Sequence, residues 1–223
     1  YDDIKTIADH RHRSAHGVAR VYLADEFPAE YRDRIFMANI HEHALLTDIL
    51  EPRGSGFVGR HGNDALLAND PKWVGFSLET GPDGAVYVLD WHDADICGAS
   101  INDGETGRIY RFAPRGLPGK TGLDLAARSD LELVELQGNR NDWYVRRARL
   151  LLQQRAAMGK LDPGVAPRLW AMLAAAPTEP LRLRALWALH VTRNLPADRL
   201  LGLLGHADAY VRAWAIQLLC EDR

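Results

Sequence analysis

The sequence has few of the residues that mark several common protein classes. Its only two cysteines, Cys97 and Cys220, form no CxxC, CxxCH or zinc-type spacing. This excludes a zinc finger, a thioredoxin-type redox pair and a c-type haem attachment motif within the chain. We expect two unpaired thiols, with a disulfide between them as the alternative. No apolar run approaches the length of a membrane-spanning helix, so no membrane span is expected.

An excess of positive charge is also missing. The chain has 27 Lys and Arg against 30 Asp and Glu, a net charge of −3. Nucleic-acid binders usually carry a basic stripe, so no nucleic-acid partner is expected. The sequence begins at Tyr1 with no recognisable signal peptide, and its ends therefore indicate no compartment.

The amino-acid composition of the chain changes near residue 117. Residues 1–117 hold 12 basic and 19 acidic residues, a balance of −7, whereas residues 118–223 hold 15 and 11, a balance of +4. The first part carries seven of the nine histidines, and 14 of the 19 glycines precede residue 123. Gly-rich turns between short aromatic and β-branched runs indicate strands, and the Leu, Ala and Arg of the second part have helical spacing. The Pro- and Gly-rich segment 114–122 is the predicted linker.

The first part predicts two groups of antiparallel strands. The expected ranges are 14–24, 33–40, 44–50 and 56–68, then 73–80, 85–91 and 107–113. Gly81-Pro-Asp-Gly84 is a tight turn, in which Asp83 can bond the backbone and Gly84 tolerates a positive φ. Four-stranded sheets without intervening helices are typical of propeller blades. A lone sheet of this kind would leave apolar faces bare, so we expect a fragment that comprises the last two blades of a β-propeller.

The second part predicts paired helices that form an α-solenoid. A Val/Leu-Arg step recurs at 145, 183 and 211, and periods of this size suit about three HEAT-like pairs. The expected helices are 129–137, 141–158, 163–175, 180–192, 196–204 and 208–220. Ser129 with Glu132 predicts a capping box, and Asp142 and Asp208 are predicted N-caps. The tryptophans expected to pack between the helices are Trp143, Trp170, Trp187 and Trp214.

Several strings in the chain together resemble one family. They are YLADEFPAEYR from Tyr22, NIHEH from Asn39, DILEPRGSGF from Asp48, LAND from Leu67, GPDGAVYVLDW from Gly81, GRIYR from Gly107 and NDWYVR from Asn141. This set resembles the planctomycete and verrucomicrobial (PVC-type) putative membrane-bound dehydrogenases, also called haem-binding proteins. The resemblance covers nearly the whole chain, although the family often has Cys-His where this sequence has Cys97-Gly98.

The resemblance implies both an architecture and an activity. It implies a propeller over 1–113, similar to the soluble quinoprotein glucose/sorbosone dehydrogenases, and HEAT-like repeats over 123–223. It also implies a periplasmic or otherwise extracytoplasmic location. The expected function is the oxidation of a sugar or alcohol with a PQQ-type quinone and Ca²⁺, with electrons passed to a c-type cytochrome domain. Any haem would lie outside this chain, and the chain alone is expected to be inactive.

Chain direction indicates which face would hold the chemistry. In antiparallel blades the turns at 25–32, 51–55 and 81–84 share one face. The opposite face then receives six histidines, His10, His12, His16, His41, His43 and His92, with Asp70, Asp90, Asp93 and Asp95. Only His61, of the histidines in this part, is left over. Propeller ligands commonly sit near the central channel on one face, so this asymmetry suggests a site.

On this reading each candidate has a role. A neutral histidine suits a general base that takes the hydroxyl proton, with His16 the first choice and His41 and His43 the other catalytic candidates. Asp90 and Asp93 suit Ca²⁺, which prefers oxygen ligands. The candidates for holding the cofactor are Asp70, Trp73, Trp91 and His92. If the strand is extended, His41 and His43 point to one side and could instead bind a transition metal or haem iron.

Two other interpretations remain open. The chain could be a non-catalytic scaffold whose histidine face binds glycan and whose helical surface binds a protein partner, because fold does not fix function. It could also relay electrons through a bound metal or haem. In structural terms, His10 and His12 can lie in a solvated loop, and His41, His43 and Asp90 can simply satisfy backbone groups at strand ends.

Overall fold

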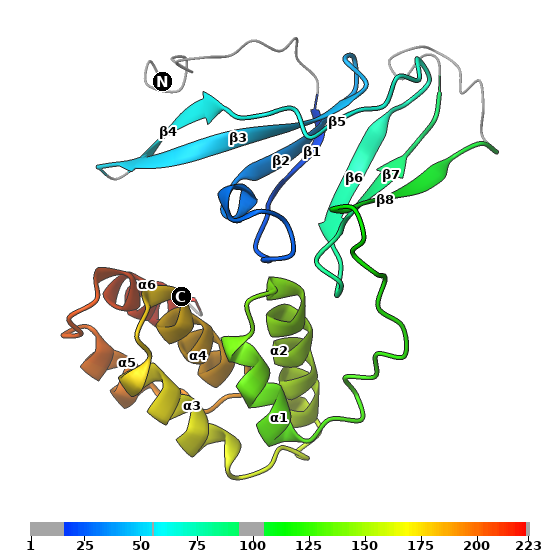
Figure 1. Cartoon of the computed structure of the whole chain (residues 1–223). Helices are drawn as coiled ribbons and strands as arrows, with labels where there is room; N and C mark the ends of the chain where they lie inside the picture. Colours follow the sequence, from blue (N-terminus) through cyan, green and yellow to red (C-terminus); the bar gives the residue numbers. More distant parts are fainter. Residues whose placement is uncertain (1–15, 55, 94–104, 222–223) are drawn as a thin grey trace. The chain divides into compact units, whose positions relative to one another are not determined.

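The computed structural model of this chain describes residues 16–54, 56–93 and 105–221. It combines antiparallel sheets and helices in two compact units, which divide between Lys120 and Thr121 (Figure 1). This boundary falls within the predicted linker segment 114–122. We call the first the sheet unit and the second the helical unit, and describe each by itself.

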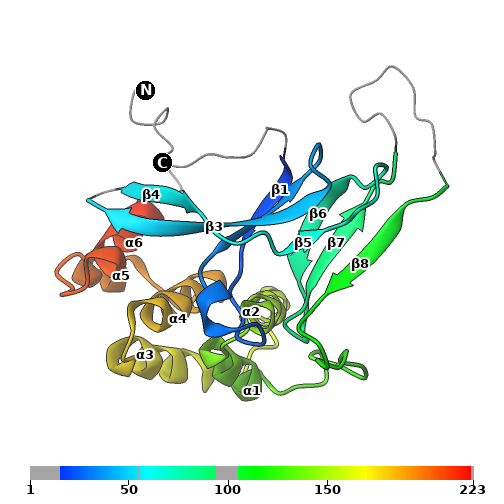
Figure 2. The ribbon, with the colours of Figure 1, turned by 45° about the horizontal axis from the view of Figure 1, so that its top comes forward.

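The sheet unit contains two antiparallel sheets in the order that the sequence predicts. The first sheet is built from β1 (His16–Val21), β2 (Ile35–Asn39), β3 (Ala44–Arg53), β4 (Gly56–His61) and β5 (Leu66–Leu67). The second is built from β6 (Gly75–Thr80), β7 (Val86–Asp90) and β8 (Arg108–Phe112). The described residues form no closed barrel, and β1 of one sheet lies against β6 of the other (Figure 2).

The strand predicted over 56–68 is interrupted. β4 and β5 both pair with β3, but residues 62–65 leave the ladder between them. A Cβ at Gly62 would lie 2.5 Å from the hydroxyl oxygen of Thr47, so the chain passes too close to β3 for any residue larger than glycine at this position. The Thr47 hydroxyl donates to the carbonyl of Asn63 at 2.7 Å. This long-range contact is invisible in the local pattern.

Each of the two sheets has a β-bulge near the start of its first strand. The register of β1 on β2 shifts between His16 and Val18, and that of β6 on β7 shifts between Gly75 and Ser77. Each bulge lies opposite the last residue of the neighbouring strand, Asn39 in one sheet and Asp90 in the other. The two sheets therefore share one local feature at corresponding strand ends.

The two sheets share one apolar core. Its largest fully buried side chains are Trp73, Tyr22, Phe36, Leu45 and Leu78. β1 and β6 approach closely because both carry glycine: a Cβ on Gly17 would meet the Gly75 carbonyl oxygen at 2.3 Å. The predicted turn at 81–84 is present, with Gly84 at a φ of 71° and the Asp83 carboxylate accepting from the Ala85 amide.

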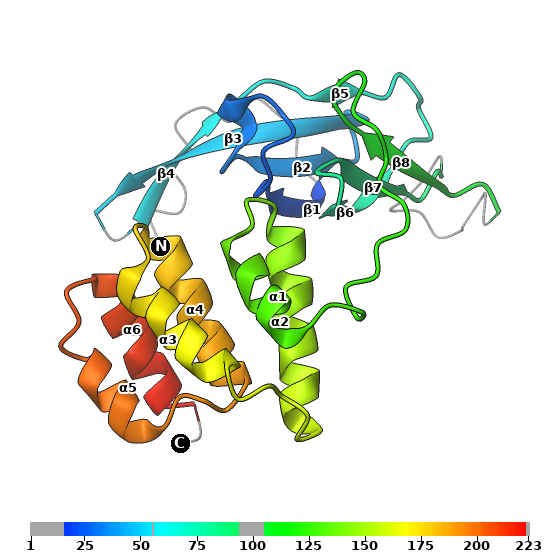
Figure 3. The ribbon, with the colours of Figure 1, turned by 60° about the horizontal axis from the view of Figure 1, so that its bottom comes forward.

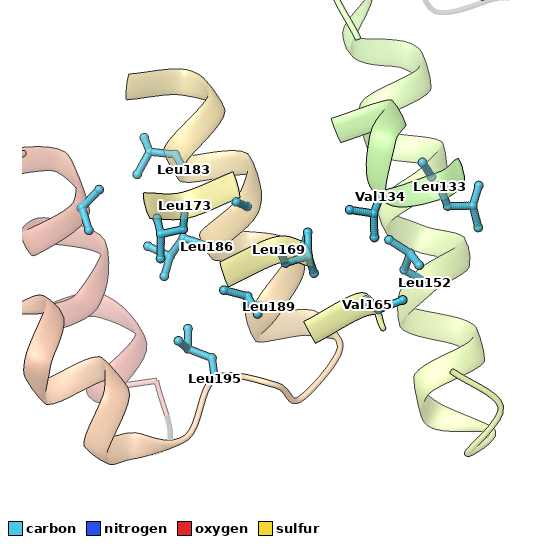
Figure 4. Packing of buried hydrophobic residues seen from close by; sticks show 14 of the residues in the cluster. Leu133, Val134, Leu152, Val165, Leu169, Leu173, Leu183, Leu186, Leu189 and Leu195 are labelled. Atoms are coloured by element: carbon cyan, nitrogen blue, oxygen red, sulfur yellow. The ribbon is translucent and has the colours of Figure 1, made fainter. Parts of the chain in front are cut away.

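The helical unit consists of three helical pairs (Figure 3). The helices are α1 (Asp130–Glu135), α2 (Asp142–Ala157), α3 (Val165–Ala175), α4 (Glu179–Val191), α5 (Ala197–Leu203) and α6 (Ala209–Leu219), with a 3-10 turn over Leu136–Gly138. The pairs are α1 with α2, α3 with α4, and α5 with α6, and the second helices also touch one another in the order α2, α4, α6. Leucines such as Leu152, Leu169 and Leu186 fill the space between them (Figure 4).

The helix ends test the predicted caps. Ser129 and Glu132 form the expected capping box, and Asp208 caps α6 through the Tyr210 amide. The prediction for Asp142 is wrong, because the side chain of Asn141 accepts from the Trp143 amide and Asp142 is the first helical residue. Asp142 instead binds arginine side chains.

Three of the four tryptophans pack as the sequence predicts. Trp170, Trp187 and Trp214 lie partly buried against the helical core. Trp143 does not join this core: its ring lies edge-on to Tyr144, with the guanidinium of Arg147 over it at 5.8 Å. The described residues contain no helix with the length and apolar character needed to cross a bilayer.

Candidate functional site

The candidate site lies at one end of the sheet unit, where β1 and β6 begin and β2 and β7 finish. We call it the histidine end and define it by His16, His41, His43 and His92. His16 is the first residue of β1 and pairs with Asn39, the last residue of β2. His41 and His43 lie in the turn between β2 and β3, and His92 follows β7. The register brings the starts of β1 and β6 and the ends of β2 and β7 to the same end of the two sheets (Figure 1, upper end). The four histidines come from these strand ends and the turns next to them.

A repeated turn positions two of these histidines. The Asn39 side-chain oxygen accepts from the His41 amide at 3.0 Å, and the Asp90 carboxylate accepts from the His92 amide at 3.0 Å. Each histidine therefore follows a buried Asn or Asp by two residues, an arrangement in which a short polar side chain closes its own turn. His92 adopts a φ of 56°, which this turn stabilises. His41 and His92 occupy equivalent places in the two sheets.

The aspartates at the histidine end are already engaged by an arginine. Arg108 donates from Nε to Asp90 Oδ2 at 2.7 Å and from Nη2 to Asp70 Oδ2 at 2.7 Å. The other Asp90 oxygen accepts from the Val74 amide at 2.7 Å as well as from His92. The hydrogen bond from Arg108, together with that from the Lys72 amide, holds the pKa of Asp70 below its ordinary value. This network ties β7, β8 and the segment before β6 together.

His92 joins the edge of this network. Its Nε2 lies 3.6 Å from Asp70 Oδ2, and its Nδ1 lies 2.8 Å from the Thr106 hydroxyl. A ring held from both nitrogens is well suited to orienting neighbouring groups. We therefore assign His92 to positioning rather than to proton transfer.

His43 has the geometry of a histidine with one basic nitrogen. Its Nδ1 lies 2.8 Å from the Trp73 carbonyl oxygen, which can only accept, so Nδ1 carries the hydrogen in the neutral ring. Nε2 then keeps its lone pair, and it makes no hydrogen bond or ion pair to any other residue of the described segments. Fixing the tautomer through the second nitrogen is how proteins orient catalytic and metal-binding histidines.

The two tryptophans expected to hold a cofactor differ sharply. Trp73 is 1% exposed and its ring packs in the core, so only its carbonyl reaches the histidine end, and its expected cofactor contact is wrong for this structure. Trp91 is 44% exposed and stacks at a tilt on Phe76, with ring centroids 5.7 Å apart. The extra residue of the β6 bulge is Phe76, which is why its ring reaches this open face.

The residues expected to bind metal do not form a metal site. All Asp90 oxygens are engaged, and Asp93 is buried. No cluster of three or more His, Cys, Asp or Glu side chains suited to a metal occurs in the part of the chain that is described. Within the described segments, Asp90 is therefore not free to bind Ca²⁺, and Arg108, which pairs with Asp70 and Asp90, is not free to bind a quinone carboxylate.

The expectation that His41 and His43 form a strand pair is also wrong. Residues 40–43 are a turn and His43 has a φ of 50°, so the two rings do not share the side of an extended strand. His41 is exposed, whereas His43 is partly buried against Trp73. His61, the remaining histidine, ends β4 beside Asp48 and Asp64. Four other residues of the sequence analysis, His10, His12, Asp95 and Cys97, lie outside the described residues.

Comparison with known families adds one result. A family described as a domain of unknown function, DUF7133, matches residues 2–116, just over half of the chain. The chain belongs to the DUF7133 family. The matched DUF7133 region spans both sheets and therefore the whole histidine end. No curated protein and no solved structure matches the chain.

Sequence reasoning missed Asn39, Arg108 and Phe76 in this DUF7133 region. A signal for the first was present: Ala-Asn-Ile-His ending at His41 and Leu-Asp-Trp-His ending at His92 both place Asn or Asp two residues before a histidine. Reading them as one repeated turn would have predicted the matching turns after β2 and β7. Arg108 pairs with residues 18 and 38 positions away, so no local pattern reveals it.

Proposed function

We propose that the histidine end receives a sugar or alcohol substrate of an oxidoreductase, with His43 accepting the proton of the reacting hydroxyl. The observation that carries the proposal is the bond between His43 Nδ1 and the Trp73 carbonyl, which leaves Nε2 as the basic nitrogen. A neutral imidazole nitrogen within reach of a hydroxyl can act as a general base. The resemblance to PVC-type dehydrogenases agrees with this chemistry.

The chain's own residues would supply orientation as well as the base. Trp91 and Phe76 offer exposed ring faces against which a sugar can pack, and Asp70, beside His92, offers carboxylate oxygens to hydroxyls. Arg108 keeps Asp70 ionised, so that carboxylate acts as an acceptor. A quinone of the PQQ class, if bound by the whole protein, would supply the hydride acceptor. Since the described residues do not fit that quinone or Ca²⁺, no further step is assigned to this chain, and electrons would pass to a cytochrome domain elsewhere.

The same proposal includes the architecture. We propose that the two sheets are adjacent blades of a β-propeller and that the helical pairs are HEAT-like repeats, in a protein of an extracytoplasmic compartment. The equivalent bulges opposite Asn39 and Asp90 support repeated blades. The contacts among the second helices α2, α4 and α6 support a solenoid.

A second candidate, a scaffold that binds glycan without chemistry, is favoured by a different observation. Asp70, Asp90 and Arg108 satisfy one another, as structural groups do, while Phe76 and Trp91 remain exposed. Stacking on aromatic rings needs no redox cofactor. The scaffold function would therefore require Trp91 and Phe76 but not the basic nitrogen of His43.

One experiment separates the two candidates. The whole proposed propeller protein, of which this chain would form two blades, is supplied with PQQ, Ca²⁺, an aldose and a redox dye and assayed for dye reduction. Aldose binding is measured by calorimetry on the same protein. We expect His43→Gln to abolish dye reduction while aldose binding changes little, and Trp91→Ala to weaken both. His190→Gln, in the helical unit, is the matched control. If aldose binding requires Trp91 but no dye reduction depends on His43, the scaffold function is favoured. If the protein binds no aldose, both candidate functions are wrong.

A further inference from the structure

Two hydrogen-bond donors are left without acceptors on the second helices of the helical unit. The Nη1 atom of Arg149 in α2 and the indole Nε1 of Trp187 in α4 are both buried, and neither has a partner among the described residues. The two groups are neighbours, since the Arg149 guanidinium carbon lies 5.4 Å from the centre of the Trp187 ring. Buried donors are nearly always satisfied, so two orphans at one place call for an explanation.

The charge around Arg149 is strongly unbalanced. Arg146 and Arg184 lie nearby, and one carboxylate, Asp142, serves them both: it accepts from Arg184 Nη2 at 3.2 Å and from Arg146. Arg184 is anchored in addition by the Gln137 and Asn139 carbonyls. Burial and the neighbouring cations lower the pKa of Arg149 despite Asp142. Arg149 is thus a partly buried cation that makes no ion pair with any described residue and feels Asp142 only at a distance.

The surroundings offer apolar contact as well as charge. Trp187 lies edge-on to Trp214 of α6, with ring centroids 5.1 Å apart, and all three side chains remain partly exposed. The helices α2, α4 and α6 touch in that order (Figure 3). The contacts of Arg149 with Trp187 and of Trp187 with Trp214 therefore run from one second helix to the next. Arg is the side chain best suited to bind a carboxylate with two parallel hydrogen bonds.

We propose that the strip defined by Arg146, Arg149, Trp187 and Trp214 binds an acidic protein segment that carries Asp or Glu beside an apolar side chain. A carboxylate of the segment bonds to Arg149 and to the Trp187 indole N–H. The apolar side chain packs on the Trp187 and Trp214 rings. An acidic protein segment fits better than nucleic acid, because the chain as a whole is negative.

The test uses fluorescence polarisation with the full chain and a labelled peptide of repeated Glu-Glu-Leu. Arg149→Gln should weaken binding by about tenfold, and Trp187→Phe, which keeps the ring but removes the N–H, by about threefold. The matched control is Arg199→Gln, since Arg199 lies over Trp170 at the same 5.4 Å but has no buried orphan donor. It should leave binding unchanged. Circular dichroism verifies that each variant is folded.

Three results would overturn the proposal. The first is equal affinity for a peptide with Gln in place of Glu. The second is an equal loss in the Arg149 and Arg199 variants, which would mean only a general charge effect. The third is tighter binding of a single-stranded oligonucleotide than of the acidic peptide, which would make nucleic acid the partner.

Discussion

At the scale of single residues, buried carboxylates that pair with arginines hold the turns and strand ends of the second sheet in place. Asp83 is buried in the turn after β6, where it accepts from the Ala85 amide, the Tyr87 hydroxyl and Arg111 Nε. Burial alone would raise its pKa, but the bonds from Arg111, Ala85 and Tyr87 outweigh it and hold the pKa of Asp83 below the ordinary value. The ionised carboxylate therefore stabilises the fold.

The first prediction concerns this carboxylate. Asp83→Asn should lower the free energy of unfolding at pH 7 by about 3 kcal/mol, because it leaves Arg111 without its buried partner. Since the folded pKa is depressed, the stabilisation is complete above the ordinary pKa of about 4 and disappears as pH falls below it. Urea unfolding at neutral and acid pH measures the difference. If the difference in unfolding free energy between wild type and variant stays constant as the pH falls below about 4, the linkage is contradicted.

A matched variant separates burial from charge. Glu51→Gln removes an ion pair with Arg60 in which both side chains are more than half exposed. We expect a change of less than about 0.5 kcal/mol, because exposed pairs are screened by solvent.

At this scale the sequence predicted the turn at residues 81–84 but not the arginines that pair with its aspartate and with Asp90. The local sequence Gly-Pro-Asp-Gly predicts both the Asp83 bond to its own backbone and the positive φ of Gly84. The partners Arg111 and Arg108 come from β8, whose register on β7 only the folded sheet defines. The roles of Asp90 and Trp73 were misassigned for the same reason, since a polar or aromatic residue at a strand end looks alike whether it is exposed or buried.

At the scale of elements, the contact of β1 with β6 depends on glycine. Gly17→Ala would place a Cβ 2.3 Å from the backbone carbonyl of Gly75, and backbone cannot move aside as a side chain can. We predict a loss of about 1–3 kcal/mol in unfolding free energy. Gly59→Ala in β4, where no atom lies within 4 Å, is the control and should change stability by less than about 0.5 kcal/mol. Equal stabilities of the two variants in thermal unfolding would contradict the close approach.

A third prediction concerns the start of α2. Asn141→Ala removes the side chain that caps the Trp143 amide and should cost about 1 kcal/mol. Asn141→Asp keeps an acceptor at that position and should retain most of the stability. Chemical denaturation measures both. If the alanine variant is as stable as the wild type, the N-cap is not Asn141.

Elements were the best predicted level. Apolar spacing of two or of about 3.6 residues, with Gly and Pro between runs, located the strands and helices to within a few residues. The misses have physical causes. Strand 56–68 is broken where the chain passes over Thr47, and the cap of α2 is Asn141 because Asn and Asp are equally good acceptors at neighbouring positions.

At the scale of the whole molecule, the second sheet presents an apolar face that no described residue covers. Leu89 and Ile109 are cross-strand partners on this face, 47% and 72% exposed. A contiguous apolar surface of this kind usually meets a partner. It is consistent with the proposed neighbouring blade.

The fourth prediction follows from this face. Replacing Leu89 and Ile109 together by Thr should reduce binding of a hydrophobic dye and self-association in sedimentation, with little change in melting temperature. The control is Leu201→Thr with Ile216→Thr, which changes two exposed residues of the helical unit. If the sheet variant instead melts far earlier than the wild type, these side chains are core residues and the face is not bare.

The account's central claim is that His43 holds its hydrogen on Nδ1 and offers Nε2 to a substrate hydroxyl. Nitrogen NMR of histidine-labelled full chain, with His43→Gln to assign the signal, tests it directly. We predict the Nδ1-protonated tautomer for His43 in the neutral ring and a shift of its Nε2 signal when a saturating aldose is added. A protonated Nε2 in the neutral ring, or a His43 signal that does not respond to the sugar, would contradict the account.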